Sequence, residues 1–220
     1  MDRISVKRVA IVFFVANVIA IAASAFSGYQ LGNVAFRFEE RQAITYFSSN
    51  QLGATALLAW LIYVLRTRLL RGEGGVRGTA FFWAISAVGF LYLMSDESFQ
   101  FHEGMDTSVF RMFGHRENPL LDGVSTALYG IGAAAVCYYY RAEITRYRST
   151  FALFSLGGVF LALTSALDIG EESKMQIAVE ESFKLLGVTS FLLGHLAAFL
   201  ETVRDIQSDL PAPSRAEQHP

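Results

Sequence analysis

Two carboxylates and a histidine lie at helical spacing in one short acidic stretch of the chain. Asp96 and Glu103 are seven residues apart, so a helix that advances by about 100° per residue places them on one face, two turns apart. His102 and Asp106 lie beside Glu103 on the same side, whereas Glu97 points about a quarter-turn away. Carboxylate oxygens and an imidazole nitrogen together suit zinc, iron or manganese. The stretch therefore predicts that Asp96, His102 and Glu103 bind a divalent metal.

Two further groups of acidic residues follow later in the chain. Asp168 and Glu172 are four residues apart and so share one helix face. Glu180 and Glu181 precede Lys184 by about one helical turn, a spacing at which opposite charges attract. Carboxylates that are held close together repel one another unless they bind a cation or a proton. We therefore expect Asp168 and Glu172 to complete the metal site, with Glu180 and Lys184 in a polar pathway beside it.

Metal-assisted hydrolysis is the chemistry that this set of residues favours. A divalent metal lowers the pKa of a bound water to about 7 and so supplies a nucleophile at neutral pH. Glu103, Glu181 and Asp168 are the predicted catalytic groups, acting as ligands or as the general base. Hydrolysis is favoured because it needs no cofactor other than the metal. Two alternatives stay open: the acids form a protonated or ion-paired network without a metal, or they lie in solvated loops.

Six apolar stretches must position these side chains. The chain has 220 residues, of which 53% are apolar and 17% charged, against about 25% charged in an average soluble domain. Backbone polar groups in lipid must be bonded within their own segment, so long apolar stretches without strand-like alternation predict helices. The stretches cover residues 9–27, 52–65, 79–94, 121–140, 151–167 and 183–200. The sequence therefore predicts an all-α, polytopic membrane bundle of six transmembrane helices over residues 1–208, followed by a flexible tail over residues 209–220.

Basic and acidic residues are sorted between alternate loops. Basic residues number 10 and acidic residues 3 in segments 1–8, 66–78 and 141–149, whereas the numbers are 6 and 13 in segments 28–51, 96–122 and 168–184. Lys and Arg near span ends favour the cytoplasmic side of a membrane. Both termini are therefore predicted to be cytoplasmic, with the acidic residues facing outward from a plasma membrane, the inner membrane of a bacterium. Residues 33–49 are expected to add a short interfacial helix on the outer side.

Two other functions remain open on the sequence alone. His195 lies 14 residues after Glu181, about 21 Å further along a helix, so it cannot join the outer site. A proton- or cation-coupled transporter would use Glu97, Glu180, Lys184 and His195 as a polar pathway. An accessory subunit of a larger membrane complex, or a homo-oligomer, would use the helices only for packing. Membrane lipids are expected partners, and nucleic acid is not, because the chain has no basic tract.

Overall fold

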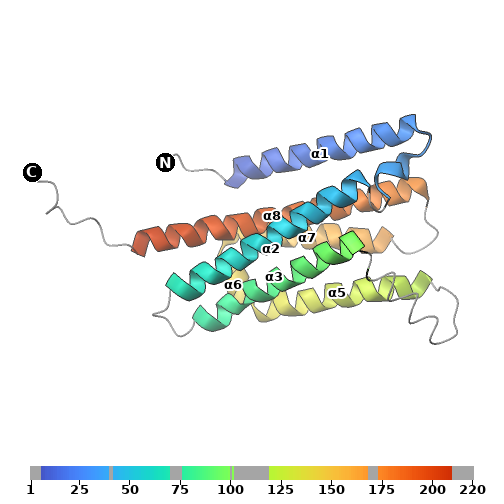
Figure 1. The fold of residues 1–220 in the computed structure, drawn as a ribbon. Helices are drawn as coiled ribbons and strands as arrows, with labels where there is room; N and C mark the ends of the chain where they lie inside the picture. The colour runs from blue at the N-terminus through green and yellow to red at the C-terminus, as the bar shows by residue number, and fades with distance from the viewer. Residues whose placement is uncertain are drawn as a thin grey trace, which may run out of the picture.

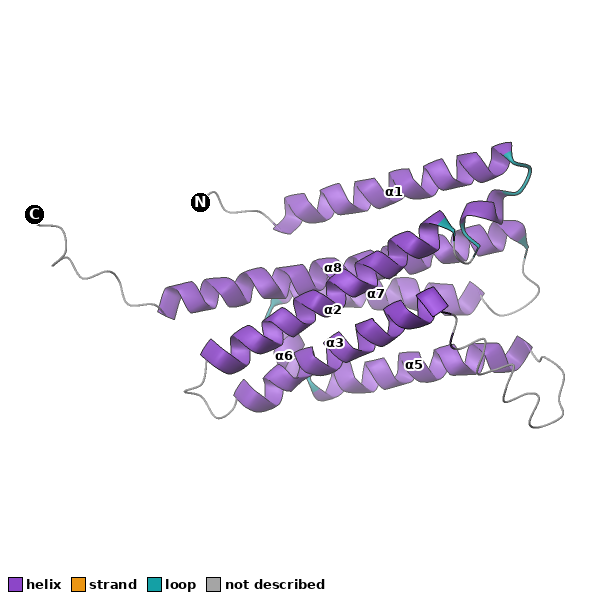
Figure 2. Ribbon diagram, in the orientation of Figure 1, coloured by secondary structure: helices purple, strands orange, loops and turns teal. Residues whose placement is uncertain are grey.

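The computed structural model describes residues 6–39, 42–69, 76–99, 101, 119–167 and 173–209, and this part of the chain is helical (Figure 1, Figure 2). The helices are α1 (Val6–Gln30), the short 3-10 helix η1 (Val34–Arg37), α2 (Ala43–Leu69), α3 (Val76–Phe99), α5 (Pro119–Tyr139), α6 (Arg141–Thr145), α7 (Arg148–Leu167) and α8 (Lys174–Asp209). No strand occurs within the described ranges, so the prediction of an all-α fold is confirmed. The predicted tail over residues 209–220 lies outside the described residues, apart from Asp209.

The long helices run side by side in one bundle, and successive ones point in opposite directions (Figure 1). α2 packs against α3 and α8, and α7 packs against α8. The beginning of α1 and the end of α8 lie at the same end of the bundle as α6, which we call the α6 end. The opposite end contains η1 and the first turns of α2 and α8, and we call it the η1 end. Side chains near the ends of these helices can therefore meet in space although they are distant in sequence.

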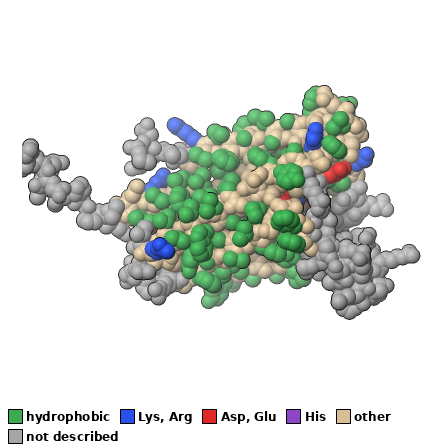
Figure 3. All heavy atoms as spheres, viewed as in Figure 1, with side chains coloured by type: hydrophobic (Ala, Val, Ile, Leu, Met, Phe, Trp, Pro, Cys, Tyr) green, Lys and Arg blue, Asp and Glu red, His purple; other side chains and the backbone are tan. Residues whose placement is uncertain are grey.

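Four helices are long and apolar enough to cross a membrane. They cover Val6–Gln30, Gly78–Phe99, Arg148–Leu167 and Lys174–Ser208. Figure 3 shows hydrophobic side chains over the middle of the visible face, with charged side chains towards its two ends. The fold is therefore compatible with a membrane protein, as predicted. The four helices contain four of the six apolar stretches that were predicted to span the membrane.

The other two predicted spans fall short for identifiable reasons. α2 has 27 residues, but a polar run from Ser48 to Gln51 lies in its first half and two arginines, Arg66 and Arg68, lie in its last turn. α5 contributes only the shorter apolar segment Leu128–Tyr139 within the part of the chain whose side chains are described. By length and composition, the described helices therefore provide four candidate spans rather than six.

The predicted interfacial helix over residues 33–49 is instead divided into two elements. The Asn33 side chain accepts a hydrogen bond from the backbone N–H of Ala35, which starts η1 as one short turn. α2 then begins at Ala43 and continues into the bundle. The prediction was wrong because apolar side chains near the break pack against α8 rather than lying on a membrane surface. These side chains form a buried cluster of Phe38, Ile44, Ala178 and Leu185.

α1 is attached to the rest of the bundle mainly at the η1 end. Asn17 and Gly28 are the buried residues of this helix. A Cβ atom on Gly28 would lie 2.7 Å from the carbonyl oxygen of Asn33, so this position needs a glycine where the chain turns back. In the first half of α1, large apolar side chains point outward, and Ile11 for example is 63% exposed. This half of α1 therefore has few partners within the bundle.

A pair of glycines brings α7 and α8 close together. A Cβ atom on Gly157 would lie 2.9 Å from the Phe191 ring and 3.1 Å from the carbonyl oxygen of Gly187. The next residue, Gly158, is exposed, and a Cβ atom there would have no neighbour within 4 Å. Small residues at a helix contact let the backbones approach, which favours helix association in a membrane. The contact between α7 and α8 therefore depends on the side of α7 that carries Gly157.

Replacing Gly157 with leucine is expected to lower the free energy of unfolding by about 1–3 kcal/mol, the usual cost of overpacking. The added side chain would collide with Phe191 and push α7 away from α8. Gly158→Leu is the matched control, because the same side chain then enters open space. Denaturant unfolding of the purified protein in detergent measures both variants. Equal stability of the two would contradict the close contact at Gly157.

Candidate functional site

Polar side chains are buried or partly buried at several levels of the bundle, and α8 contributes to each level. From the η1 end to the α6 end, α8 supplies Lys184, Thr189, His195 and Thr202. The first and last of these are 18 residues apart, about 27 Å along a helix, which is close to the hydrocarbon thickness of a bilayer, about 30 Å. Polar groups inside a membrane are costly unless they are paired. The partners of these residues therefore identify the contacts that hold the helices in place.

At the η1 end, one ammonium group binds two carboxylates from different helices. Lys184 Nζ lies 2.8 Å from Oε1 of Glu181 and 3.0 Å from Oε1 of Glu97. Ser48 Oγ donates a hydrogen bond of 2.8 Å to the same Glu97 oxygen, which adds α2 to the contact. The three charged side chains are between 13% and 25% exposed. We call Ser48, Glu97, Glu181 and Lys184 the carboxylate–lysine cluster.

The carboxylate–lysine cluster tests two details of the sequence interpretation. The attraction expected between Glu181 and Lys184 from their spacing is confirmed. Glu97, expected to point away from the metal-binding face of its helix, turns towards the Lys184 ammonium. Asp96, the preceding residue in α3, is buried with 9% of its surface exposed. Glu181, a predicted catalytic group, is therefore held in an ion pair that also fixes the ends of α3 and α8.

α7 reaches the same end of α8 through a weaker contact. Thr164 Oγ1 donates a long hydrogen bond of 3.5 Å to the backbone carbonyl oxygen of Glu180. The same hydroxyl also donates to the carbonyl oxygen of Phe160 in its own helix. The end of α3 and the end of α7 are thus both connected to the start of α8.

Four of the predicted metal ligands lie outside the described residues. These are His102, Glu103, Asp168 and Glu172. Within the part of the chain that the structure describes, no group of three or more His, Cys, Asp or Glu side chains is placed to hold a metal ion. Asp96, Glu180 and Glu181 therefore do not form a metal site by themselves. A metal at this end would need ligands from the undescribed segments that follow α3 and α7.

Near the middle of the bundle, a chain of hydrogen bonds connects α1, α2 and α8. Thr189 Oγ1 donates to Gln51 Oε1 at 2.8 Å, and Gln51 Nε2 donates to Asn17 Oδ1 at 2.9 Å. Asn17 Nδ2 in turn donates to the carbonyl oxygen of Phe13 at 2.7 Å. All three polar side chains are buried. This chain of hydrogen bonds is the polar attachment of α1 to the bundle core.

His195 occupies a closed, hydrogen-bonded position deeper in the bundle, where it is 0% exposed. Its Nδ1 lies 2.8 Å from the carbonyl oxygen of Phe191, which can only accept, so Nδ1 donates the proton. Its Nε2 lies 2.8 Å from Ser86 Oγ, and in the neutral ring this nitrogen accepts from the hydroxyl. The imidazole is surrounded by the rings of Trp83, Phe90 and Phe154, whose centroids lie 4.9 to 5.5 Å from its own. Both ring nitrogens are therefore engaged, and the proton relay through His195 stays a prediction.

At the α6 end, a buried ion pair joins α2 to α6. Arg66 Nη1 lies 2.9 Å from Glu143 Oε1, and the two side chains are 1% and 2% exposed. Tyr147 OH accepts from Arg66 Nη1 at 2.7 Å, and Trp83 Nε1 donates to Glu143 Oε1 at 2.8 Å. Thr202 Oγ1 of α8 lies 3.4 Å from Tyr147 OH. Elements α2, α3, α6 and α8 therefore meet at this pair.

The Arg66–Glu143 pair was not predicted from the sequence, because both residues fall in segments that were interpreted as loops between apolar stretches. The two are 77 residues apart, and no spacing rule relates positions at that distance. One signal was present in the sequence. Arg66 directly follows the apolar stretch 52–65, and Glu143 lies three residues after the stretch 121–140. A charge so close to an apolar span is costly unless it is hydrated or paired.

Removing one partner of the buried pair should destabilise the bundle strongly. Glu143→Gln is expected to lower the free energy of unfolding by about 3–5 kcal/mol, because the Arg66 charge then stays buried without compensation. Asp205→Asn is the matched control, since Asp205 pairs with Arg146 at 3.3 Å on the surface, where both are more than 40% exposed. This control should cost less than about 1 kcal/mol. Denaturant titration in detergent measures the free energy of unfolding of both variants. Similar decreases in the two would contradict the burial of Glu143.

The carboxylate–lysine cluster makes a separate prediction. Lys184→Met is expected to lower the free energy of unfolding by about 1.5–3 kcal/mol, the range for hydrogen bonds to charged groups, because Glu97 and Glu181 then lose their shared cation. Lys174→Met, on the exposed start of the same helix, should change it by less than about 0.5 kcal/mol. Adding Glu97→Gln to Lys184→Met should recover part of the loss. If Lys184→Met is as stable as Lys174→Met, the cluster does not hold α3 to α8.

Comparison with known proteins places the whole bundle in one family. No curated protein and no solved structure matches the chain. A family model matches residues 8–199, a range that begins in α1, ends in α8 and contains the carboxylate–lysine cluster, His195 and the Arg66–Glu143 pair. The match covers most of the chain. The chain therefore belongs to the family described as domain of unknown function DUF8692.

Proposed function

We propose that this protein is a multi-pass enzyme of the bacterial inner membrane, with six transmembrane helices, both termini in the cytoplasm and the η1 end facing outward. Four helices are apolar enough to cross a membrane, and α2 and α5 lie alongside them in the same bundle (Figure 1). With 27 residues, α2 is about 40 Å long, which exceeds the hydrocarbon thickness of about 30 Å. The exposed arginines Arg68, Arg141 and Arg148 at the α6 end support a cytoplasmic position for that end.

The proposed active site is a divalent-metal site at the η1 end. The observation that carries it is the contact of Lys184 with both Glu97 and Glu181, which brings the end of α3 beside the start of α8. Asp96 lies buried directly before Glu97. If the helix continues beyond Phe99, it returns to the Asp96 face at position 103, after about two turns. The same contact would therefore bring a second carboxylate to this end of the bundle.

The residues of the proposed site divide into two roles. The metal ligands would be Asp96, His102, Glu103 and either Asp168 or Glu172. Glu181 changes from the direct catalytic role expected from sequence to a positioning role, because its Oε1 atom binds Lys184. Glu103 takes part as a ligand, and whichever of Asp168 and Glu172 does not bind the metal is the proposed general base. This division separates the charges that hold the helices together from the charges that would do chemistry.

The proposed reaction is the hydrolysis of a lipid or another membrane-resident substrate. A divalent zinc, iron or manganese ion would lower the pKa of its bound water to about 7, which supplies a nucleophile at neutral pH. The position of the carboxylate–lysine cluster near the ends of membrane-compatible helices supports this substrate class, because that level of a bundle faces lipid headgroups.

Elemental analysis of the purified protein tests the metal site. Wild type is expected to contain stoichiometric zinc, iron or manganese. His102→Ala and Glu103→Ala should lower the metal affinity by more than about 10-fold, a loss already typical when an outer-shell partner is removed. His115→Ala is the matched control, because it removes a histidine from the same predicted outer segment outside the proposed ligand set. It should retain the wild-type metal content.

Two results would contradict the metal site. The first is wild-type protein, purified without chelators, that contains no stoichiometric metal. The second is equal metal loss in all three variants, which would show that no histidine or glutamate of the proposed set is specific. Either result would favour the alternative of a proton- or cation-coupled transporter.

A further inference from the structure

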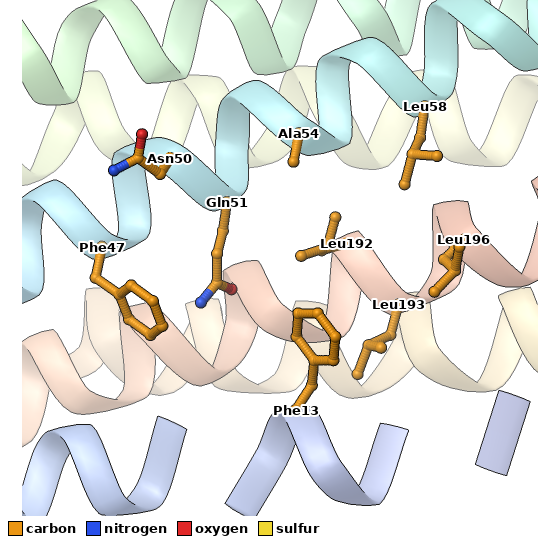
Figure 4. Close-up of a pocket in the computed structure, with 9 residues that line it drawn as sticks. All are labelled: Phe13, Phe47, Asn50, Gln51, Ala54, Leu58, Leu192, Leu193 and Leu196. Carbon is orange, nitrogen blue, oxygen red and sulfur yellow. The ribbon is translucent and has the colours of Figure 1, made fainter. Parts of the chain in front are cut away.

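A lateral groove lies between α1, α2 and α8, separate from the carboxylate–lysine cluster (Figure 4). Its volume is about 330 Å³, and seven of its nine lining side chains are apolar. Phe13 of α1 points into it towards α2 and α8, opposite Leu192 and Leu193 of α8 (Figure 4). The groove exists because the first half of α1 has few partners in the bundle. It is thus open on the side where a membrane would supply lipid chains.

Two polar residues, Asn50 and Gln51, lie along the groove about one turn after Phe47, but the surface that the groove exposes is almost entirely apolar. The Asn50 amide donates to the carbonyl oxygen of Tyr46, and the Gln51 amide binds Asn17 and Thr189. Gln51 follows Ser48 by three residues, a rise of about 4.5 Å along α2, and Ser48 donates its hydrogen bond to Glu97. Gln51 holds α1 through Asn17, so this part of the groove is fixed rather than loose. A ligand in the groove would therefore be held by apolar contacts.

The length of the groove fits one leaflet of a bilayer. Along α2 it extends from Phe47 to Leu58, eleven residues, which is about 16 Å of helix. The hydrocarbon core of a bilayer is about 30 Å thick, so one leaflet accounts for about half of that. The groove lies beside the first half of α2 and the middle of α8.

The volume of the groove is sufficient for a single hydrocarbon chain. A chain about 4 Å wide, the contact distance between carbon atoms, fills about 200 Å³ over this length, within the 330 Å³ present. The groove therefore accommodates one such chain.

We propose that this groove binds one acyl chain of a membrane lipid, with the ester and headgroup towards the η1 end. Moving a chain from lipid into a groove releases no hydrophobic free energy, because both surroundings are apolar. Selectivity must therefore come from close packing. The identification of the bound lipid as the substrate rests on the proposed function, whereas the binding of the chain does not.

Photo-crosslinking tests this site in the full-length protein. The probe is a phospholipid with a diazirine on one acyl chain, present in small amount in phosphatidylethanolamine nanodiscs. Label should concentrate on the groove segments that contain Phe13, Ala54 and Leu192. It should exceed the label on Val88 and Leu91, which are exposed side chains of α3 away from the groove.

Two tryptophan variants of α2 make the test specific. Ala54→Trp fills the groove and should lower the groove label several-fold. Leu57→Trp is the matched control, because Leu57 is 59% exposed on the same helix and does not line the groove. It should keep the wild-type label. Equal label on the groove and on Val88, or no effect of Ala54→Trp, would show ordinary lipid contact and overturn the proposal.

Metal content, measured on the same samples, separates this proposal from the proposed function. Specific groove label in a wild-type protein without metal would leave the lipid site intact and contradict the metal enzyme. Stoichiometric metal without specific groove label would do the reverse. Ala54→Trp should keep its metal, because Ala54 lies about two turns along α2 from Ser48.

Discussion

The ammonium group of Lys184 is the interaction on which the η1 end depends. It binds carboxylates from α3 and α8, and Ser48 connects α2 to the same Glu97 oxygen. Without this shared cation, two partly buried carboxylates would repel each other. The cluster therefore holds the end of α3 beside the start of α8, the end of the bundle at which we propose the metal site.

The remaining polar contacts follow the same physical constraint at other depths. A helix bundle in lipid must satisfy its polar groups internally, because the hydrocarbon has no water to bind them. Gln51 meets this requirement by bridging Asn17 and Thr189, and Arg66 meets it through Glu143 and Tyr147. These contacts hold the helices at fixed positions. α1 has only the first of them, which explains why a groove opens beside its other half.

Local spacing was enough to predict part of this arrangement. Glu181 and Lys184 share one helix, so their pairing followed from the three-residue separation. The pairing of Arg66 with Glu143 could not be predicted in the same way, because it depends on how α2 and α6 meet. The segment around Phe38 was misread for a related reason: its apolar face suits a membrane surface as well as a protein core, and only the position of α8 distinguishes the two. The ligands beyond α3 and α7 remain predictions from sequence.

X-ray absorption spectroscopy at the edge of the bound metal tests the central claim most directly, since it reports the ligands themselves. We predict a shell of oxygen and nitrogen atoms at about 2.0–2.2 Å, the usual range for carboxylate and imidazole ligands of zinc, with the outer-ring scattering of one histidine. A spectrum that matches the hydrated ion, or a protein without a metal edge, would contradict it.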